Sequence, residues 1–150
     1  MNEFQEVIQK LILLFRDLTA IESKMLEAAR GEHIGLLENY MTKEQAFIMQ
    51  LKGLEKEKDK AQAEAGYKRM SFREILEAQG EEERARFLPL FEELSREVQM
   101  FQEVHEDLTV IMEVNLRQIN KKLDDTEGHI YSDNTLTGTS APKSVTSRRV

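Results

Sequence analysis

The stretch that decides the fold is IESKMLEAARGEHIGLLENYMTKEQAFIMQL, residues 21–51. A helical spacing of apolar residues runs into Gly31-Glu32-His33, stops there, and resumes at Ile34. Glycine is the usual residue at the left-handed position that ends a helix, so we assign the left-handed conformation to Gly31. Because the interruption is short, the two helical segments are expected to fold back on each other as an antiparallel hairpin.

The segment before the turn, residues 2–29, carries apolar residues at alternating steps of three and four. Such an a/d pattern over four heptads is typical of a helix that packs lengthwise along a partner helix. Its eight positions are Phe4, Val7, Leu11, Leu14, Leu18, Ile21, Met25 and Ala28. The segment after the turn, residues 34–64, has a weaker seam, in which Glu44 occupies a position where an apolar residue is expected, and Gly66 ends it.

Two further helices are expected after the hairpin. Residues 71–80 predict a short helix, with Ser71 and Glu74 at the spacing of a capping box. Residues 87–123 predict a long helix, whose apolar residues off the main stripe indicate a central position or a second partner. Pro89 either occupies the first turn of this helix, which is the interpretation we favour, or kinks it.

Composition narrows the class of protein and its location. The net charge of −7 makes a nucleic-acid-binding role and contact with anionic membranes unfavourable. The chain contains no cysteine and no apolar run long enough for membrane insertion. Glu3 and Glu6 stand where a signal peptide carries positive charge, so a cytoplasmic location is expected. Nine of the last 25 residues are Ser or Thr; we therefore expect a bundle domain over 1–125 and a disordered tail over 126–150.

The common sequence motifs of catalytic and metal-binding sites are missing from this sequence. None of the three histidines, His33, His105 and His129, has a carboxylate three positions earlier, so the Glu-x-x-His motif of helical di-metal sites is absent. Gly-x-x-x-x-Gly-Lys and Gly-x-Gly-x-x-Gly are also absent. We expect no enzyme, no metal and no cofactor, and interpret His105 as a partly buried seam or flank residue.

The order of these segments resembles that of a known family. The similarity begins at LILLFRDLTAIESKMLEAARGEHIGLLENYMTKEQAFIMQLKGLEKEK (11–58) and continues through MSFREIL (70–76) and EEERARFLPLFEELSREVQMFQEVHEDL (81–108). It includes a leucine-rich helix with Glu22 in its middle, the brief turn, and Glu44 after a pair of leucines. Over about residues 4–123 the chain resembles the FlgN family of flagellar export chaperones.

This resemblance implies a fold, a function and partners. The fold would be all-α: an antiparallel helical hairpin, a short helix and a long C-terminal helix in an elongated bundle. The function would be that of a cytosolic chaperone, using no ATP, that binds the hook-filament junction proteins FlgK and FlgL before their secretion by the flagellar type III apparatus. The resemblance maps the client contacts onto Leu108, Ile111, Met112, Leu116, Ile119 and Leu123. It also suggests Tyr131 as a contact with the export gate and its component FlhA.

A second function is compatible with the same pattern. The clean seam of residues 2–29 can pair between chains as well as within one, as in a self-associating structural coiled coil or an adaptor protein. The short turn at residues 31–33 weighs against this alternative, because folding back satisfies the seam inside one chain.

Overall fold

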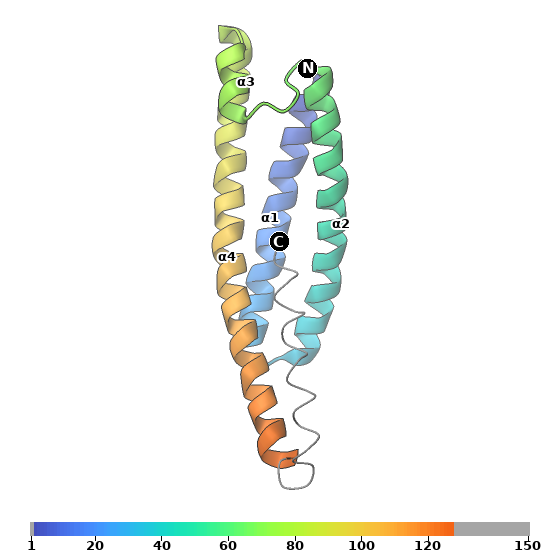
Figure 1. Cartoon of the computed structure of the whole chain (residues 1–150), viewed down its shortest axis with the longest axis vertical. Helices are drawn as coiled ribbons and strands as arrows, with labels where there is room; N and C mark the ends of the chain where they lie inside the picture. Colours follow the sequence, from blue (N-terminus) through green and yellow to red (C-terminus); the bar gives the residue numbers. More distant parts are fainter. Residues whose placement is uncertain (1, 128–150) are drawn as a thin grey trace. The chain divides into compact units, whose positions relative to one another are not determined.

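The computed structural model describes the backbone of residues 2–127 and the side chains of residues 3–123. This part of the chain forms four helices and no strand (Figure 1). The helices are α1 (Asn2–Arg30), α2 (Ile34–Glu64), α3 (Phe72–Ala78) and α4 (Glu81–Glu127). The predicted all-α bundle is thereby confirmed. The predicted tail lies outside the described residues except for its first two positions, which continue α4.

The chain divides into two compact units, residues 1–111 and residues 112–150. The first unit contains α1, α2, α3 and the greater part of α4. The second unit is described only as the last turns of α4, residues 112–127, which we call the distal segment of α4. The domain boundary predicted at residue 125 stays a prediction.

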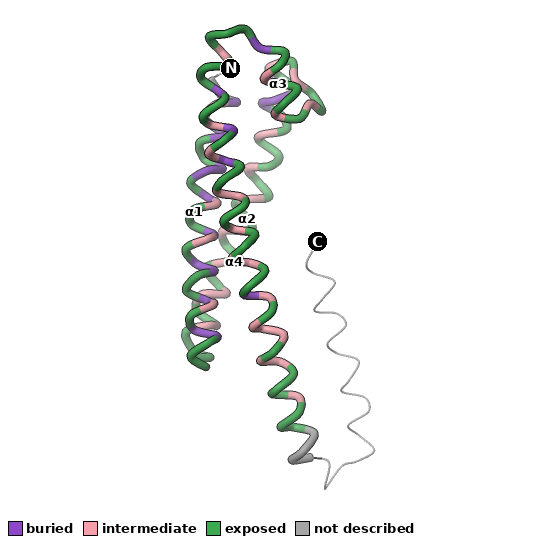
Figure 2. The backbone as a smooth tube through the Cα atoms, turned by 90° about the vertical axis from the view of Figure 1, so that its left-hand side faces the viewer, coloured by how far each residue is buried: buried purple, intermediate pink, exposed green. Residues whose placement is uncertain are grey.

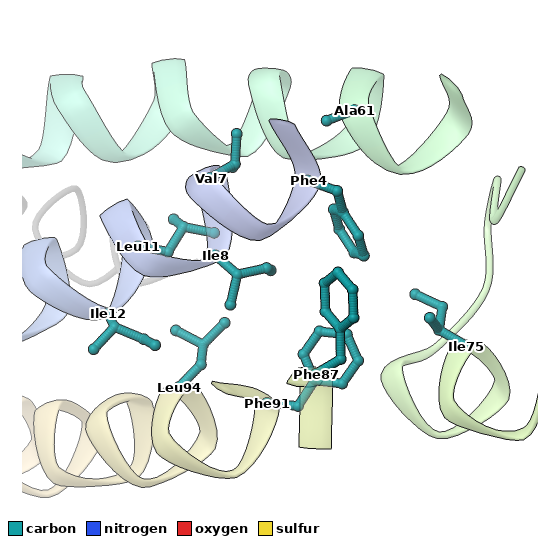
Figure 3. Close-up of a cluster of buried hydrophobic side chains, with 10 residues drawn as sticks. All are labelled: Phe4, Val7, Ile8, Leu11, Ile12, Ala61, Ile75, Phe87, Phe91 and Leu94. Carbon is teal, nitrogen blue, oxygen red and sulfur yellow. The ribbon is translucent and has the colours of Figure 1, made fainter. Parts of the chain in front are cut away.

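Helix α1 is the central helix of the first unit and lies between α2 and α4 (Figures 1 and 3). All eight residues of its predicted seam are buried. The buried set extends to a second face that the seam did not include, with Ile8, Ile12 and Glu22. A helix covered on two sides needs apolar residues over a wide arc, which α1 has and α2 lacks. Only Ala61 and Gln62 of α2 are buried.

Aromatic side chains form the core at the end of the unit where α1 begins (Figure 3). Phe4 of α1 stacks on Phe87 of α4 with ring centroids 5.5 Å apart. Phe72, which begins α3, stacks on Phe91 of α4 at 4.2 Å. Ile75 of α3 is completely buried against the same cluster. Each such aromatic pair adds about 0.5–1.5 kcal/mol beyond the burial of its area, so this end is firmly packed.

The turn between α1 and α2 is a Schellman motif, but its left-handed residue is not the predicted glycine. The N–H of His33 donates to the carbonyl of Ala28 at 2.9 Å, and the N–H of Glu32 donates to the carbonyl of Ala29 at 3.3 Å. This pattern places Glu32 at the position after the cap, with φ of 59°. Gly31 still belongs to the helical ladder, and a Cβ there would lie 2.8 Å from Cδ2 of His33. The assignment of the left-handed conformation to Gly31 was therefore wrong.

The end of α2 matches the prediction at Gly66, which has φ of +92°. Behind this glycine, the buried side chain of Gln62 donates two hydrogen bonds from Nε2, to the carbonyls of Tyr67 and Met70, both at 2.8 Å. One amide therefore fixes the connection between α2 and α3 from inside.

Helix α3 begins with the predicted capping box. The Ser71 hydroxyl accepts a hydrogen bond from the Glu74 N–H, and the Glu74 carboxylate accepts one from the Ser71 N–H, each at 3.2 Å. At the other end, Arg84 of α4 donates to the carbonyls of Leu76 and Gln79, both at 2.9 Å. These bonds satisfy backbone groups that a short helix leaves unpaired at its ends.

Pro89 lies inside α4 and not in its first turn, so the favoured interpretation was wrong. The helix begins at Glu81, where three consecutive glutamates suit the positive end of the helix dipole. Pro89 removes the hydrogen bond to the carbonyl of Ala85, but it points to solvent. Packing of the neighbouring Phe87 and Phe91 in the aromatic core offsets this loss.

Candidate functional site

The six residues assigned to client contact form one stripe of α4 but differ in exposure. Leu108 is 4% exposed and belongs to the interior of the first unit. Ile111, Met112 and Leu116 are half-buried. Ile119 and Leu123 are 48% and 49% exposed. The residues that present apolar surface are therefore those of the distal segment, whereas Leu108 is occupied by packing. Tyr131 lies outside the described residues.

No described residue of α4 after Leu108 is buried (Figure 2). Two valines off the stripe, Val110 and Val114, are 60% and 36% exposed. Large apolar side chains that face water in this number are typical of surfaces that a partner covers. Of the two explanations predicted for the extra apolar residues of α4, a central position in the first unit is wrong, because α1 is the helix covered on two sides.

A polar cluster inside the first unit was not anticipated. Glu22 of α1 is 1% exposed, and its Oε1 lies 2.8 Å from Nδ1 of His105 on α4. Glu44, on α2, is half-buried, and its carboxyl and that of Glu22 affect each other's pKa. Helices α1, α2 and α4 thus each contribute one titratable side chain to this part of the first unit. We call Glu22, Glu44 and His105 the carboxyl–histidine cluster.

The electrostatics assign the protons in this cluster. Burial raises the pKa of Glu22, and the hydrogen bond from Glu44 acts against this rise. Burial, together with the hydrogen bond to Glu22 and the charge of Glu22, raises the pKa of Glu44 to about 8. Glu44 therefore carries a proton near neutral pH. The Nδ1 of His105 lies 2.8 Å from Oε1 of Glu22, and 43% of the His105 side chain faces solvent.

One signal in the sequence could have identified half of this cluster. Glu22 lies eleven residues before His33 and Glu44 lies eleven residues after it. In an antiparallel hairpin with a short turn, residues equally distant from the turn face each other. Two carboxyl groups at such positions, one of them breaking an apolar seam, predict a pair. His105 could not be placed in this way, because α3 and its connections separate α4 from the hairpin.

A shallow groove of about 770 Å³ runs beside α1, between α2 and α4. Leu11 and Phe15 of α1 contribute its apolar surface, and Phe72 lies at one end. Its walls also carry charged and amide side chains, such as Glu55 and Gln99. This mixed lining shows no arrangement of groups that would select one small ligand.

The described residues contain no group of His, Asp and Glu side chains arranged to hold a metal ion. None of the helices in the described part combines the length and the apolar composition that crossing a bilayer requires. Because burial and the neighbouring Glu22 raise the pKa of Glu44 to about 8, this carboxyl can hold a proton near neutral pH.

Comparisons with protein-family models, with curated proteins and with solved structures found no match for this chain.

Proposed function

We propose that this chain is a cytoplasmic export chaperone that holds amphipathic helices of client proteins on the distal segment of α4. The observation that carries the proposal is the exposed apolar stripe after Leu108, and above all Ile119 and Leu123. The resemblance to the FlgN family suggests the clients: the hook-filament junction proteins FlgK and FlgL, delivered to the flagellar type III apparatus.

The chemistry of this surface suits reversible holding. A half-exposed Leu or Ile gains about 1 kcal/mol when a partner covers it, and the matching side chains of the client gain a similar amount. The entropy lost when the two chains associate and their side chains become ordered opposes this gain in free energy. A complex built in this way forms and dissociates without nucleotide hydrolysis, as a carrier of secreted proteins requires.

The test measures the mass of the full chain by light scattering during size exclusion, alone and mixed with the terminal helical segments of FlgK and of FlgL from the same genome. We expect a one-to-one complex with at least one segment. The double variant Ile119→Ser and Leu123→Ser should abolish it, since both side chains belong to the proposed surface. The matched control, Gln118→Ser and Lys122→Ser, changes exposed polar residues of the same turns and should leave the complex intact.

Leu108 is not a suitable position for this test. Leu108→Asp would place a charge in the interior, so loss of binding in that variant would report unfolding. Absence of a complex with either segment, or equal loss of binding in the two double variants, would contradict the proposal.

Self-association is the second candidate function. The α1 seam that suggested it is buried within the chain, so it is not available for pairing between chains. What favours self-association is the exposure of two large apolar side chains elsewhere, Leu13 of α1 at 58% and Met49 of α2 at 73%. A dimer or larger species of the chain alone, lost on Leu13→Ser and Met49→Ser, would support this candidate.

A further inference from the structure

We propose that the outward side of α1 binds a second copy of this chain in the antiparallel direction, with charged residues of one copy paired to those of the other. This inference deepens the second candidate function, self-association, on which it rests, and it is independent of client holding by the distal segment of α4. The surface, which we call the α1 face, consists of Glu6, Lys10, Leu13, Asp17, Ala20 and Lys24.

The α1 face is exposed and lies on one side of its helix. Its members follow one another at steps of three or four residues, and such positions are neighbours on the surface of an α-helix. All six are exposed, and Leu13, in the middle, is 58% exposed. Lys10, Leu13 and Asp17 also line a groove of about 420 Å³ between α1 and α2. On the α2 side this groove is open at Gly53, which has no side chain, so the α1 face has a hollow beside it that can receive side chains of a second copy.

The four charged side chains of the α1 face are not used within the chain. None of them belongs to an ion pair of the described residues. Glu6 and Lys10 have the i, i+4 spacing that suits a pair within one helix, yet they do not form one. Arg16 of the same helix is by contrast paired with α4. The charges of the α1 face are therefore available to a partner.

The order of these charges makes a second copy the fitting partner. Along the helix the face reads acidic, basic, apolar, acidic and basic, which is complementary to its own reverse. When two copies cross in the antiparallel direction at residue 14, Lys10 of one copy lies opposite position 18 of the other, and Glu6 lies opposite position 22. The axial offset is then about 1.5 Å between Lys10 and Asp17 of the second copy, and about 3 Å between Glu6 and Lys24 of the second copy.

The same arrangement brings the apolar centres together and repeats each ion pair. Leu13 of one copy lies opposite position 15 of the other, so the two leucines are within about 3 Å along the axis. The two-fold axis generates each pair twice, because the same surface serves both copies. A parallel pair in register would place like charges opposite each other. Charge complementarity therefore selects the antiparallel arrangement.

One charge on the α2 side of the groove opposes this arrangement. In the hairpin, Glu57 of α2 is level with Lys10, since the two lie about equally far from the turn at residues 31–33. Asp17 of the second copy would approach Glu57 as well as Lys10. Removing the charge of Glu57 should therefore strengthen the dimer, although the substitution removes a charged group from its surface.

The test uses full-length chains and depends on the reciprocity of the pairs. Sedimentation velocity of the wild type at low salt, over about 5–500 μM, should show a reversible equilibrium between monomer and dimer that weakens in high salt. Lys10→Glu and Asp17→Lys each create two pairs of like charge, so each alone should raise the dissociation constant about tenfold or more. An equimolar mixture of the two variants has opposite charges at both contacts. A heterodimer should then form with about the wild-type affinity, and its recovery would show that both variants are folded.

Two further variants test the position of the surface. Lys52→Glu makes the same change of charge at an exposed residue of α2 that does not line the groove, and it should leave dimerisation unchanged. Glu57→Gln should lower the dissociation constant a few-fold, and a weaker dimer in that variant would contradict the antiparallel arrangement.

The outcomes separate this inference from the function on which it rests. A dimer that Lys10→Glu and Asp17→Lys leave unchanged would overturn the α1 face as the surface, while self-association through another surface would stand. A mixture of the two variants that dimerises no better than either alone would also overturn it. A wild type that stays monomeric at all concentrations would overturn both this inference and the second candidate function.

Discussion

The stability of the chain should fall as pH rises from 5.5 to 8, and Glu44→Gln should remove most of that fall. The pKa of Glu44 is raised from 4.5 to about 8 by folding. Below 4.5 both the folded and the unfolded chain carry this proton; between 4.5 and 8 only the folded chain does. The stabilisation that proton binding gives is therefore complete at low pH and is lost as pH rises through the folded value.

The magnitude follows from the same shift. Each pH unit in this window lowers the free energy of unfolding by at most about 1.4 kcal/mol, or about 3.4 kcal/mol from pH 5.5 to 8. Glu44 is partly exposed, and screening by solvent reduces the effect to about 1–2 kcal/mol. Glu44→Gln should match the wild type near pH 5.5 and exceed it at pH 8.5.

Urea unfolding followed by helical circular dichroism at pH 5.5, 7 and 8.5 measures these differences, with Glu38→Gln as the control on the same helix. The control should show the full slope of the wild type. A wild type more stable at pH 8.5 than at pH 5.5, or an undiminished slope in Glu44→Gln, would refute the assignment of the proton to Glu44.

Three further substitutions test individual features of the fold by the same unfolding assay. Pro89→Ala should raise the free energy of unfolding by about 1–3 kcal/mol, since it restores a helical hydrogen bond on an exposed face; no gain would mean that the local backbone is not helical. Glu32→Gly should add up to about 1 kcal/mol by removing the cost of a left-handed residue with a Cβ, and Glu32→Ala should add none. Gln62→Leu should cost about 1–3 kcal/mol, because two loop carbonyls lose their donor; unchanged stability would show that water replaces it.

The hairpin and the core of α1 could be predicted because each depends on local information. Alternating steps of three and four fix which side of a helix is apolar, whatever it packs against. A turn of three residues leaves the chain no route except back along itself. Glu32 was missed because Gly31 is the better residue for a left-handed position by itself. A side chain at position 31 would collide with the ring of His33, which explains why residue 31 is a glycine. This contact becomes visible only in the folded turn.

The sequence was less informative about α2 and α4. Both contain more apolar residues than their packing uses, so composition predicted more burial than the structure shows. Ile48 fits the predicted seam of α2 but is 36% exposed. Which apolar residues of a helix become core depends on how many neighbours cover it, and the neighbours of α4 depend on a connection through α3. The number of covering neighbours also explains why Leu108 is buried whereas Ile119, on the same stripe, is exposed.

The carboxyl–histidine cluster also bears on how α4 finds its register along α1. Apolar seams repeat every seven residues, so sliding α4 by one heptad would keep many apolar contacts. Such a slide would leave the buried Glu22 without its hydrogen bond to His105, and a buried polar group left without a partner costs about 1–3 kcal/mol. Arg16 of α1, which pairs with Glu93 and Glu97 of α4, would lose its partners in the same movement. The stacking of Phe4 on Phe87 would be lost as well, so the polar contacts and the aromatic core together distinguish this register from its nearest alternatives.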